Sequence, residues 1–375
     1  MMNEFLPSKQ IVRDVDLIVV GGGSAGMAAS IAAAVQGLKV TVFDASGESY
    51  DKACGEGLMP PAVAVLAALG VAVSESVPFC GVAYMGQSRE RVEALFAANR
   101  FGLGVRRRIL RQAMWSRARE LGVEIIERRV TEMVETKNCV TIEGRVAPWV
   151  CISTGSRDGL LKTVGLHDSR PKKDRPSRTG LRRHAKMMPW SNFVEVYWSD
   201  YCELYVTPVS SELVNISILS WKPVTFDDAL KLFPAVSARC QGVEWDDVVA
   251  GVSPLAHLGR ARNRGRFFLA GDAAGFLDAM TGEGNSLAIL SGVALGHSIA
   301  SKNPYSYRLK WLKIVWAYWL ITSAALMVSR PGWRRKASLK LVMRWPFILR
   351  GGLRMLSRMA CSSNVHYTLF AILLG

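Results

Sequence analysis

Three glycines near the start of the chain have the spacing that brings a backbone close to a phosphate group. Gly21, Gly23 and Gly26 form a GxGxxG pattern directly after a short apolar, β-branched run, Leu17 to Val20. The first glycine permits a tight turn, the second lets a pyrophosphate approach the backbone, and the third allows close helix–strand packing. The small residues from Met27 to Gln36 predict a helix, whose N-terminal N–H groups attract phosphates.

Asp44 adds a carboxylate at the end of the next predicted strand, Lys39 to Phe43. At this distance from the glycines an acid binds ribose hydroxyls. The combination predicts a bound dinucleotide in preference to an ordinary glycine turn, and we expect Ser24, Ala25 and Ala45 to line the same site. An acid repels a 2′-phosphate, so NADP is not expected there.

Three other side chains are candidates for proton transfer. Cys54 lies beside Gly55 in a glycine-rich turn, where a thiol could gate substrate or donate a proton, or simply fill a small buried space. Glu56 is a candidate acid, with a surface carboxylate as the alternative. His184 could face a substrate or cap a strand.

The elements that must position these residues alternate strand and helix, continue into a sheet, and return to strand and helix. An amphipathic helix carries Leu110, Met114 and Ala118 on one face. Alternating, turn-bounded segments predict an antiparallel sheet. The expected strands are Val77 to Tyr84, Glu124 to Ile126, Val150 to Gly155, Phe193 to Trp198, Cys202 to Val206, Leu213 to Leu219 and Arg266 to Ala270, with a hairpin over Val130 to Val134 and Cys139 to Ile142. Helices are expected over Pro60 to Leu69, over Asp227 to Phe233 and from Gly284, with a basic linker over Ser156 to Lys186.

Composition places the chain among globular proteins. It has 375 residues, half of them hydrophobic, which is enough for two or three domains with a large core. The seven cysteines are scattered without a CxxC or Cys/His cluster, so we expect reduced thiols, no metal site and a cytoplasmic location. The first residues contain no apolar signal-peptide segment.

Four segments in register resemble the flavoprotein monooxygenase-like superfamily and, within it, the geranylgeranyl reductase family. They are GGGSAG with Asp44, KACGEGLMP from Lys52, GLGVRRRILRQAM around Arg107, and FFLAGDAAGFLDAMTGEGNSLAI. The likeness covers residues 15 to 300. It implies FAD as the resident cofactor, visited transiently by NAD(P)H or another donor, since the sequence has no second nucleotide fingerprint.

The resemblance also assigns roles to residues far from the glycine turn. Asp272 would accept a hydrogen bond from the ribityl chain, with Gly271 permitting close approach; a helix N-cap is the alternative. The segment containing Gly282, Gly284 and Asn285 would place backbone N–H groups against one edge of the flavin. The arginine that would reach the FAD is Arg107, with Arg106 and Arg108 as competitors, and Cys54 and Gly55 would also contact the cofactor.

One departure from the superfamily pattern lies after the strand that ends near residue 152. Flavin hydroxylases usually carry an Asp-Gly motif there, whereas this chain has Thr154 and Gly155, with Asp158-Gly159 displaced. This weakens the hydroxylase assignment, although we still expect Thr154 and Gly155 to contact the cofactor. The absence of a WxWxIP motif disfavours the halogenases.

The C-terminal quarter carries most of the excess positive charge. The net charge is +16, no Asp or Glu follows Glu283, and basic residues alternate with apolar ones after Trp311. Residues 305–360 could therefore lie on an anionic membrane, pack as helices on the domain, or span a bilayer. A basic face could also touch nucleic acid, but nothing else in the sequence supports this, and the oligomeric state is open.

The predicted fold is α/β: a Rossmann-like FAD-binding domain of the glutathione reductase-2 type, an inserted antiparallel β-sheet substrate domain, and a C-terminal helical extension. The FAD-binding domain is assigned to residues 15–78, 100–160 and 250–300, the substrate domain to 79–99 and 161–249, and the extension to 301–375. The resemblance implies reduction of C=C bonds in a lipophilic, isoprenoid-like substrate. The alternatives are an O₂-dependent monooxygenase acting on a hydrophobic molecule, and a non-catalytic, FAD-stabilised membrane-binding module.

Overall fold

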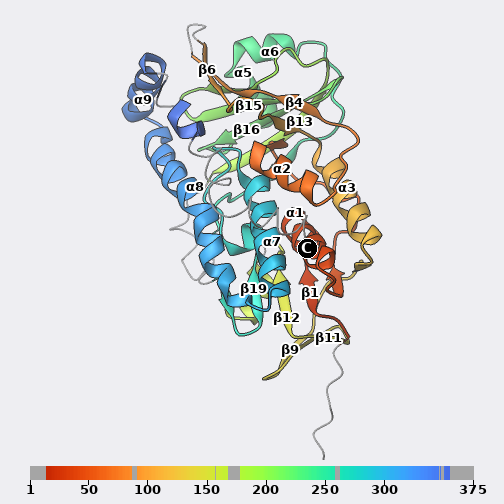
Figure 1. Cartoon of the computed structure of the whole chain (residues 1–375). Helices are drawn as coiled ribbons and strands as arrows, with labels where there is room; N and C mark the ends of the chain where they lie inside the picture. Colours follow the sequence, from red (N-terminus) through yellow and green to blue (C-terminus); the bar gives the residue numbers. More distant parts are fainter. Residues whose placement is uncertain are drawn as a thin grey trace, which may run out of the picture.

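A parallel sheet carries the glycine-rich turn and forms the lower half of the molecule in Figure 1. The computed structural model describes residues 14–86, 91–156, 158–167, 178–257, 262–345, 347 and 350–354. All neighbouring pairs in this sheet are parallel except the one at the β18 edge. The strand order is β18 (Asn263–Arg264), β19 (Phe267–Leu269), β12 (Trp149–Ile152), β1 (Leu17–Val20), β2 (Val40–Phe43) and β8 (Glu124–Ile126).

A second, seven-stranded sheet lies above the first in Figure 1 and supplies the other wall of the site. Its pairs are antiparallel, apart from the parallel pair of β14 with β5. The order is β17 (Ala250–Val252), β13 (Thr179–Lys186), β16 (Leu213–Ser220), β15 (Cys202–Ser210), β14 (Val194–Trp198), β5 (Gly81–Met85) and β6 (Arg91–Leu95).

Smaller elements connect or cover the two sheets. Two three-stranded sheets consist of β3 (Gly57–Leu58), β7 (Gly102–Gly104) and β4 (Val77–Phe79), and of β11 (Arg145–Ala147), β10 (Val140–Ile142) and β9 (Met133–Glu135). The helices before the C-terminal quarter are α1 (Ser24–Val35), α2 (Pro60–Ala68), α3 (Arg107–Glu120), α4 (Asp158–Thr163), α5 (Phe226–Lys231), α6 (Pro234–Arg239), the 3₁₀ helix η2 (Gly271–Ala274) and α7 (Gly284–Ala300).

Helix α7 packs tightly on α1, which brings two distant parts of the sequence together. A Cβ atom on Gly292 would lie 2.1 Å from the carbonyl oxygen of Ala25, and one on Gly296 would lie 2.4 Å from that of Ala29. A side chain at either glycine would therefore force the helices apart. This contact fixes the loop before α7 beside the N-terminus of α1.

The C-terminal quarter forms η3 (Pro304–Ser306), α8 (Tyr307–Ser329) and α9 (Trp333–Arg344) along the left edge of Figure 1. Among the described helices, the segment Pro304–Ser329 is long and apolar enough to cross a membrane by length and composition. The side chains of residues 339, 342 and 343, in the stretch where basic and apolar residues alternate, lie outside the described part of the chain, as do residues 355–375.

Two local predictions were wrong. The predicted linker, residues 156–186, contains α4 and the whole of β13, which lies inside the seven-stranded sheet; residues 157 and 168–177 lie outside the described part. Its polar residues hid β13, because Arg182 and His184 point into a buried polar network instead of to solvent. The strand expected over Val77 to Tyr84 is divided into β4 and β5, which join different sheets.

Candidate active site

The glycine-rich turn opens onto a cavity of about 610 Å³ between the strand ends and α1. Predicted residues that line it are Gly21, Gly23, Ser24, Ala25, Asp44, Ala45, Arg107, Thr154, Gly155 and Asp272. No side chain caps the N-terminus of α1, so its first N–H groups are free to meet a phosphate. Gly26 is buried beneath the turn, where a Cβ atom would lie 1.9 Å from the carbonyl oxygen of Gly21.

The groups around this cavity fit a dinucleotide such as FAD. A Cβ atom added to Gly23 or Gly155 would meet nothing within 4 Å, so both backbones are open to a ligand. The hydroxyl of Thr154 is buried without a hydrogen-bond partner. An orphaned buried hydroxyl is costly unless a ligand or water satisfies it. These residues would therefore hold the phosphates and sugars of the cofactor.

Asp44 is fixed by the loop that follows β2 and by α3. Its Oδ1 accepts hydrogen bonds from the N–H of Ser46 at 2.8 Å and from Arg111 at 2.8 Å, and its Oδ2 accepts one from the N–H of Gly22 at 2.6 Å. Arg111 also donates to the carbonyl oxygen of Gly22 at 3.0 Å. Burial lowers the pKa of Arg111, while the nearby charge of Asp44 partly offsets this effect.

Arg111 was missed by the sequence analysis, which considered Arg106, Arg107 and Arg108. Its spacing of four residues from Arg107, one helical turn along the same face of α3, is the signal that could have revealed it. Arg107 lines the cavity, whereas Arg106 is buried against Asp246 at 2.5 Å and Arg108 is exposed. Arg107 and Arg111 thus place two positive charges beside the site.

Asp272 lies at the junction of this cavity with a second one. A Cβ atom on Gly271, whose φ is +62°, would lie 2.7 Å from the Cβ of Ala25, so the loop after β19 touches the start of α1. The Asp272 carboxylate faces Lys52 Nζ at 3.4 Å. Two segments more than two hundred residues apart in the sequence are therefore adjacent at this junction.

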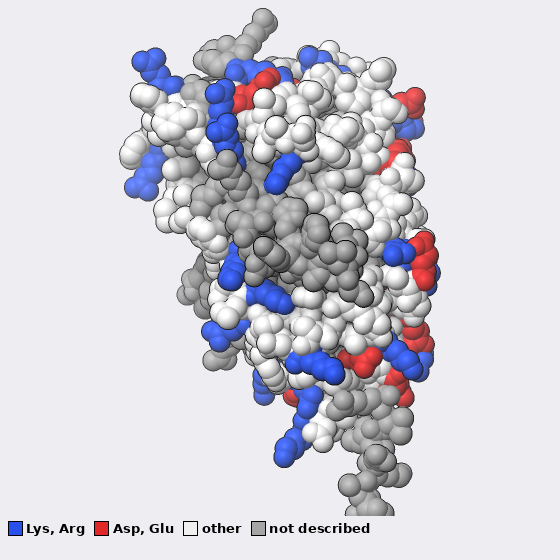
Figure 2. Space-filling model, viewed as in Figure 1, with Lys and Arg blue, Asp and Glu red and all other residues white. Residues whose placement is uncertain are grey.

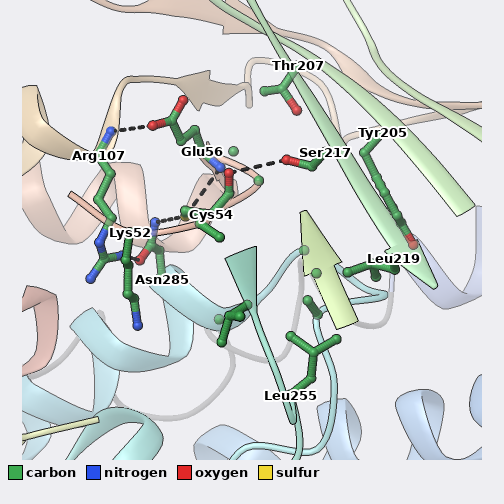
Figure 3. A pocket seen from close by; sticks show the side chains of 18 of the residues that line it. Lys52, Cys54, Glu56, Arg107, Tyr205, Thr207, Ser217, Leu219, Leu255 and Asn285 are labelled. Carbon is green, nitrogen blue, oxygen red and sulfur yellow. Dashed lines mark hydrogen bonds between the residues drawn. The ribbon is translucent and has the colours of Figure 1, made fainter. Parts of the chain in front are cut away.

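The second cavity, of about 190 Å³, is mainly apolar. Predicted residues in its lining are Cys54, Gly55, Glu56, Arg107, Asp272, Gly282, Gly284 and Asn285. Figure 3 shows Cys54, Glu56 and Asn285 on one side and Leu219, Leu255 and Tyr205 on the other. Asn285 joins the polar side, because it accepts a hydrogen bond from Arg107 at 2.9 Å and donates one to Cys54 Sγ at 3.3 Å.

Glu56 is completely buried at the wall of this cavity, so the surface alternative was wrong. Its Oε1 accepts a hydrogen bond from the N–H of Arg107 at 2.8 Å, and its Oε2 accepts one from Asn215 at 2.8 Å. Its backbone φ of +59° is strained for a residue other than glycine. Burial acts to raise the pKa of Glu56, but the hydrogen bond and charge of His184 outweigh it and the pKa is lowered.

His184 lies within β13 and does not cap the strand, so that alternative was wrong as well. Its Nε2 contacts Glu56 Oε2 at 2.6 Å, and its Nδ1 contacts Asp247 Oδ2 at 2.6 Å. The ring therefore lies between two carboxylates, and the guanidinium of Arg182 lies 3.0 Å from the same Nδ1. Asp247 is partly exposed and pairs with Arg182, so the three residues connect the cavity wall to solvent.

Comparisons with known proteins agree with the geometry of the first cavity. Residues 16–62 match the family model described as FAD binding domain. A menaquinone reductase of Mycolicibacterium smegmatis is 54% identical over 57 residues, which cover 15% of this chain but only 14% of that protein. A putative 2-heptyl-3-hydroxy-4(1H)-quinolone synthase, AqdB1 of Rhodococcus erythropolis, is 25% identical over 309 residues, 76% of this chain and 79% of the relative.

Solved structures show the fold. A flavoprotein/dehydrogenase from Cytophaga hutchinsonii superposes with a TM-score of 0.78 at 17% identity, covering 96% of this chain and 99% of its own. The anhydrotetracycline hydroxylase OxyS from Streptomyces rimosus has a TM-score of 0.73 at 17% identity, over 94% and 76% of the two chains. A variant of the halogenase PltM in complex with FAD has a TM-score of 0.75 at 14% identity, over 95% and 85%.

The predicted fold class is therefore confirmed, and solved flavin-dependent enzymes share this fold, whereas membership of the geranylgeranyl reductase family is not confirmed. The named relatives are enzymes, which weighs against a non-catalytic module. Residues 16–62 form an FAD-binding domain, and the fold and the relatives together support an FAD-dependent oxidoreductase.

Proposed function

We propose that this chain reduces a carbon–carbon double bond of a lipophilic, isoprenoid-like substrate, with electrons from NAD(P)H or another donor. The proposal rests on one observation: a buried Glu–His–Asp chain runs from near the surface to the wall of an apolar cavity that adjoins the dinucleotide site. Saturating a double bond consumes two electrons and two hydrogens, one of which is a proton that water cannot deliver inside an apolar cavity.

The cavity itself supports an apolar substrate. Its floor and roof are built from aromatic and aliphatic side chains, namely Met59, Phe79, Val194, Leu219, Leu255 and Phe276. The polar side that holds Cys54 and Glu56 faces this apolar lining, and Tyr205, Thr207 and Ser217 add hydroxyl groups from the seven-stranded sheet. Such a site binds an alkyl or prenyl chain by excluding water and orients its reacting carbons toward the polar side.

The Glu–His–Asp chain supports proton delivery. His184 would pass a proton to Glu56 Oε2 across 2.6 Å and recover one from the Asp247 side. Asn215 and the N–H of Arg107 hold the Glu56 carboxylate in place, so that it faces the cavity in one orientation. Cys54, whose thiol lines the same side, is the second group from which a proton could reach the substrate.

FAD would be held by the glycine-rich turn of Gly21, Gly23 and Gly26 and by Asp272, and it would supply two-electron transfer at the junction of the two cavities. Lys52 and Arg107, which line both cavities, would place positive charge beside it. The loop with Gly282 and Gly284 would lay its backbone against the ring. The relative named menaquinone reductase supports a lipid substrate of this kind.

A second candidate function is favoured by a sequence relative that aligns over most of the chain. The relative aligned over 309 residues is named as a quinolone synthase, and OxyS is a hydroxylase. The same cavity would then admit O₂ with a hydrophobic aromatic molecule, and NAD(P)H would serve as the electron source. His184 and Glu56 would deprotonate the substrate instead of protonating it.

Turnover under argon separates the two. The purified protein is mixed with NADH or NADPH and with geranylgeraniol or menaquinone, and products are analysed by mass spectrometry. The proposal expects saturated product without O₂, and in D₂O it expects solvent deuterium on the carbon that receives the proton. Oxygenated product that forms only in air would overturn it in favour of the second candidate.

A pair of variants tests the proton path itself. Glu56→Gln keeps the size and hydrogen-bonding capacity of the side chain but cannot carry the proton, so we expect reduction of the substrate to slow by about 100-fold. Reduction of the bound flavin by NAD(P)H and the flavin content should stay unchanged. Cys54→Ala is the control for the other candidate donor. Full activity of Glu56→Gln with loss of activity in Cys54→Ala would transfer the role to the thiol.

A further inference from the structure

Exposed apolar side chains are concentrated in the C-terminal quarter. Of the 17 large apolar residues exposed in the described part of the chain, 11 lie between residues 305 and 347. Soluble proteins rarely expose contiguous apolar patches, and those that do use them for contact. The catalytic half of the molecule does not account for this concentration.

Helix α8 has two largely apolar faces, one of which is exposed and the other buried. One face is exposed and carries Leu309, Leu312, Trp316, Leu320 and Met327, with exposed fractions of 65%, 46%, 50%, 58% and 67%. Their spacing places them on one stripe along the helix. The opposite face is buried and carries Tyr307, Trp311, Val315, Tyr318 and Thr322.

The buried face is tied to the FAD-binding domain along its length. The hydroxyl of Tyr307 donates to the carbonyl oxygen of Leu269 at 2.7 Å, and that of Tyr318 donates to the carbonyl oxygen of Asp278 at 2.8 Å. A helix held in this way presents one side to its surroundings and would have to leave the domain to cross a bilayer. The exposed stripe therefore fits contact with the surface of a membrane.

Helix α9 continues the surface and is held just as firmly. Arg335 is buried and donates to the carbonyl oxygens of Ser199 at 2.7 Å and Cys202 at 2.6 Å, and to Glu203 at 3.0 Å. Its neighbour Trp333 is 75% exposed, and Trp345, after the end of the helix, is 50% exposed. Tryptophan is the side chain enriched at the level of lipid headgroups.

The charges that α8 and α9 themselves carry around the stripe are all positive, although Lys336 also lies 3.9 Å from the exposed Asp200. Exposed bases flank it at Lys313, Lys336, Lys340 and Arg344, and no Asp or Glu follows Glu283 in the sequence. Figure 2 shows Lys and Arg over α8 and α9 at the left edge, while most of the visible Asp and Glu lie toward the opposite edge. A basic rim beside an apolar, Trp-containing stripe is complementary to anionic lipids.

We propose that the exposed stripe of α8, together with α9, is the docking surface for an anionic lipid bilayer. Leu312, Trp316 and Leu320 enter the interface, and the bases of α9 contact the lipid phosphates. The inference does not depend on the reaction catalysed, since it rests on the surface alone.

Vesicle sedimentation of the full-length, flavin-loaded protein tests this surface. We expect the protein to sediment with phosphatidylglycerol-containing vesicles, to bind pure phosphatidylcholine vesicles about tenfold more weakly, and to lose affinity as salt is raised. Protein that remains in the supernatant with anionic vesicles at low salt would overturn the proposal.

Variants locate the contact. The double change Leu312→Glu/Trp316→Glu should lower affinity for the anionic vesicles by at least about tenfold. Its matched control, Met188→Glu/Val248→Glu, alters two exposed apolar residues elsewhere and should bind as the wild type does. Lys340→Glu/Arg344→Glu should weaken binding more than the charge-matched control Lys137→Glu/Lys162→Glu. Flavin absorbance and the unfolding midpoint verify that each variant is folded.

Two other occupants of this surface are distinguishable. Light scattering that shows a dimer for the wild type and a monomer for Leu312→Glu/Trp316→Glu, with unchanged vesicle binding, would make the stripe an interface between copies. Loss of vesicle binding on removal of residues 355–375 alone, with the double variant still binding, would assign the membrane contact to that segment. Either result would overturn the proposal.

Discussion

Two buried glutamates near the apolar cavity have pKa values that are shifted in opposite directions. Glu56 lines the cavity and is surrounded by His184, Asn215 and the N–H of Arg107, which together lower its pKa below the ordinary value of 4.5 despite complete burial. Glu283 lies between two glycines of the same cavity, is 7% exposed, and has its pKa raised by burial to about 8.

The difference shows that hydrogen-bonding and charged neighbours, and not the depth of burial, decide the direction in which the pKa of each carboxyl group is shifted. At neutral pH the lowered pKa favours the carboxylate form of Glu56, and the raised pKa favours the neutral acid form of Glu283. If the proposed function is correct, the ionised group is the one on the side that would relay protons.

The largest effect is expected from His184→Leu. This change removes the ring nitrogens that contact Glu56 and Asp247 at 2.6 Å and leaves the buried Glu56 carboxylate short of a partner, so the free energy of unfolding should fall by about 3–5 kcal/mol. Urea unfolding measures it. If the loss is below about 1 kcal/mol, the Glu56 corner does not depend on its partner and the contrast with Glu283 fails.

Glu283→Gln should have an intermediate effect of the opposite sign. The folded protein holds a proton on Glu283 that the unfolded chain releases above its ordinary pKa of 4.5, so the stability of the wild type falls as pH rises from there toward 8. The amide removes this term, and the apoprotein variant should gain more than about 1 kcal/mol at pH 8 and almost nothing at pH 4. Thermal unfolding at the two pH values checks the sign, and an equal change at both would contradict it.

A fall in pH tests Glu56, just as a rise in pH tests Glu283. Because the pKa of Glu56 is lowered on folding, its stabilising contribution is complete above 4.5 and is lost as pH falls through the folded value. Glu56→Gln should therefore make the protein less stable at pH 7, by about 1–3 kcal/mol, and flatten the loss of stability below pH 4.5. Urea unfolding between pH 3 and pH 7 measures both slopes.

The smallest effect is expected at Lys186, two residues after His184 on the same strand. It pairs with Glu244, but both side chains are exposed, 44% and 73%. Screening by water makes such a pair nearly neutral. Lys186→Met should leave the unfolding midpoint unchanged within error, and a large shift would show that exposure does not separate the two kinds of pair.

Sequence reasoning found what neighbouring residues encode. The glycine-rich turn depends on the spacing of three glycines within six residues. The motifs also assigned Asp272 to the same cofactor as this turn, and the loop before Asp272 does touch the start of α1. The Glu56–His184–Asp247 chain was not predicted, because His184 is 128 residues from Glu56 and 63 residues from Asp247 and a single sequence does not reveal their pairing. β13 was not predicted as a strand because its buried face carries the polar residues Arg182 and His184, where a strand usually carries apolar ones.

The reaction-level predictions differ in what supports them. FAD follows from motifs with a local physical function and is supported by the matched family model. NAD(P)H is expected to bind only transiently, and the sequence contains no second nucleotide-binding motif for it. The substrate depends on the shape and lining of a cavity formed by the seven-stranded sheet together with the segments around Cys54, Asp272 and Asn285, which spacing along the sequence does not encode.

Arg335 also gives the C-terminal helices a role in folding. It belongs to a buried series of charges in which Glu203 contacts Arg335 on one side and Arg178 on the other, and Arg178 reaches Asp278 at 2.7 Å before the loop of the apolar cavity. A protease that trimmed the protein back beyond α9 would leave the Glu203 carboxylate, which is wholly buried, short of a cation. The C-terminal helices and the sheet that carries Glu203 consequently belong to one cooperative unit, and we expect them to unfold together.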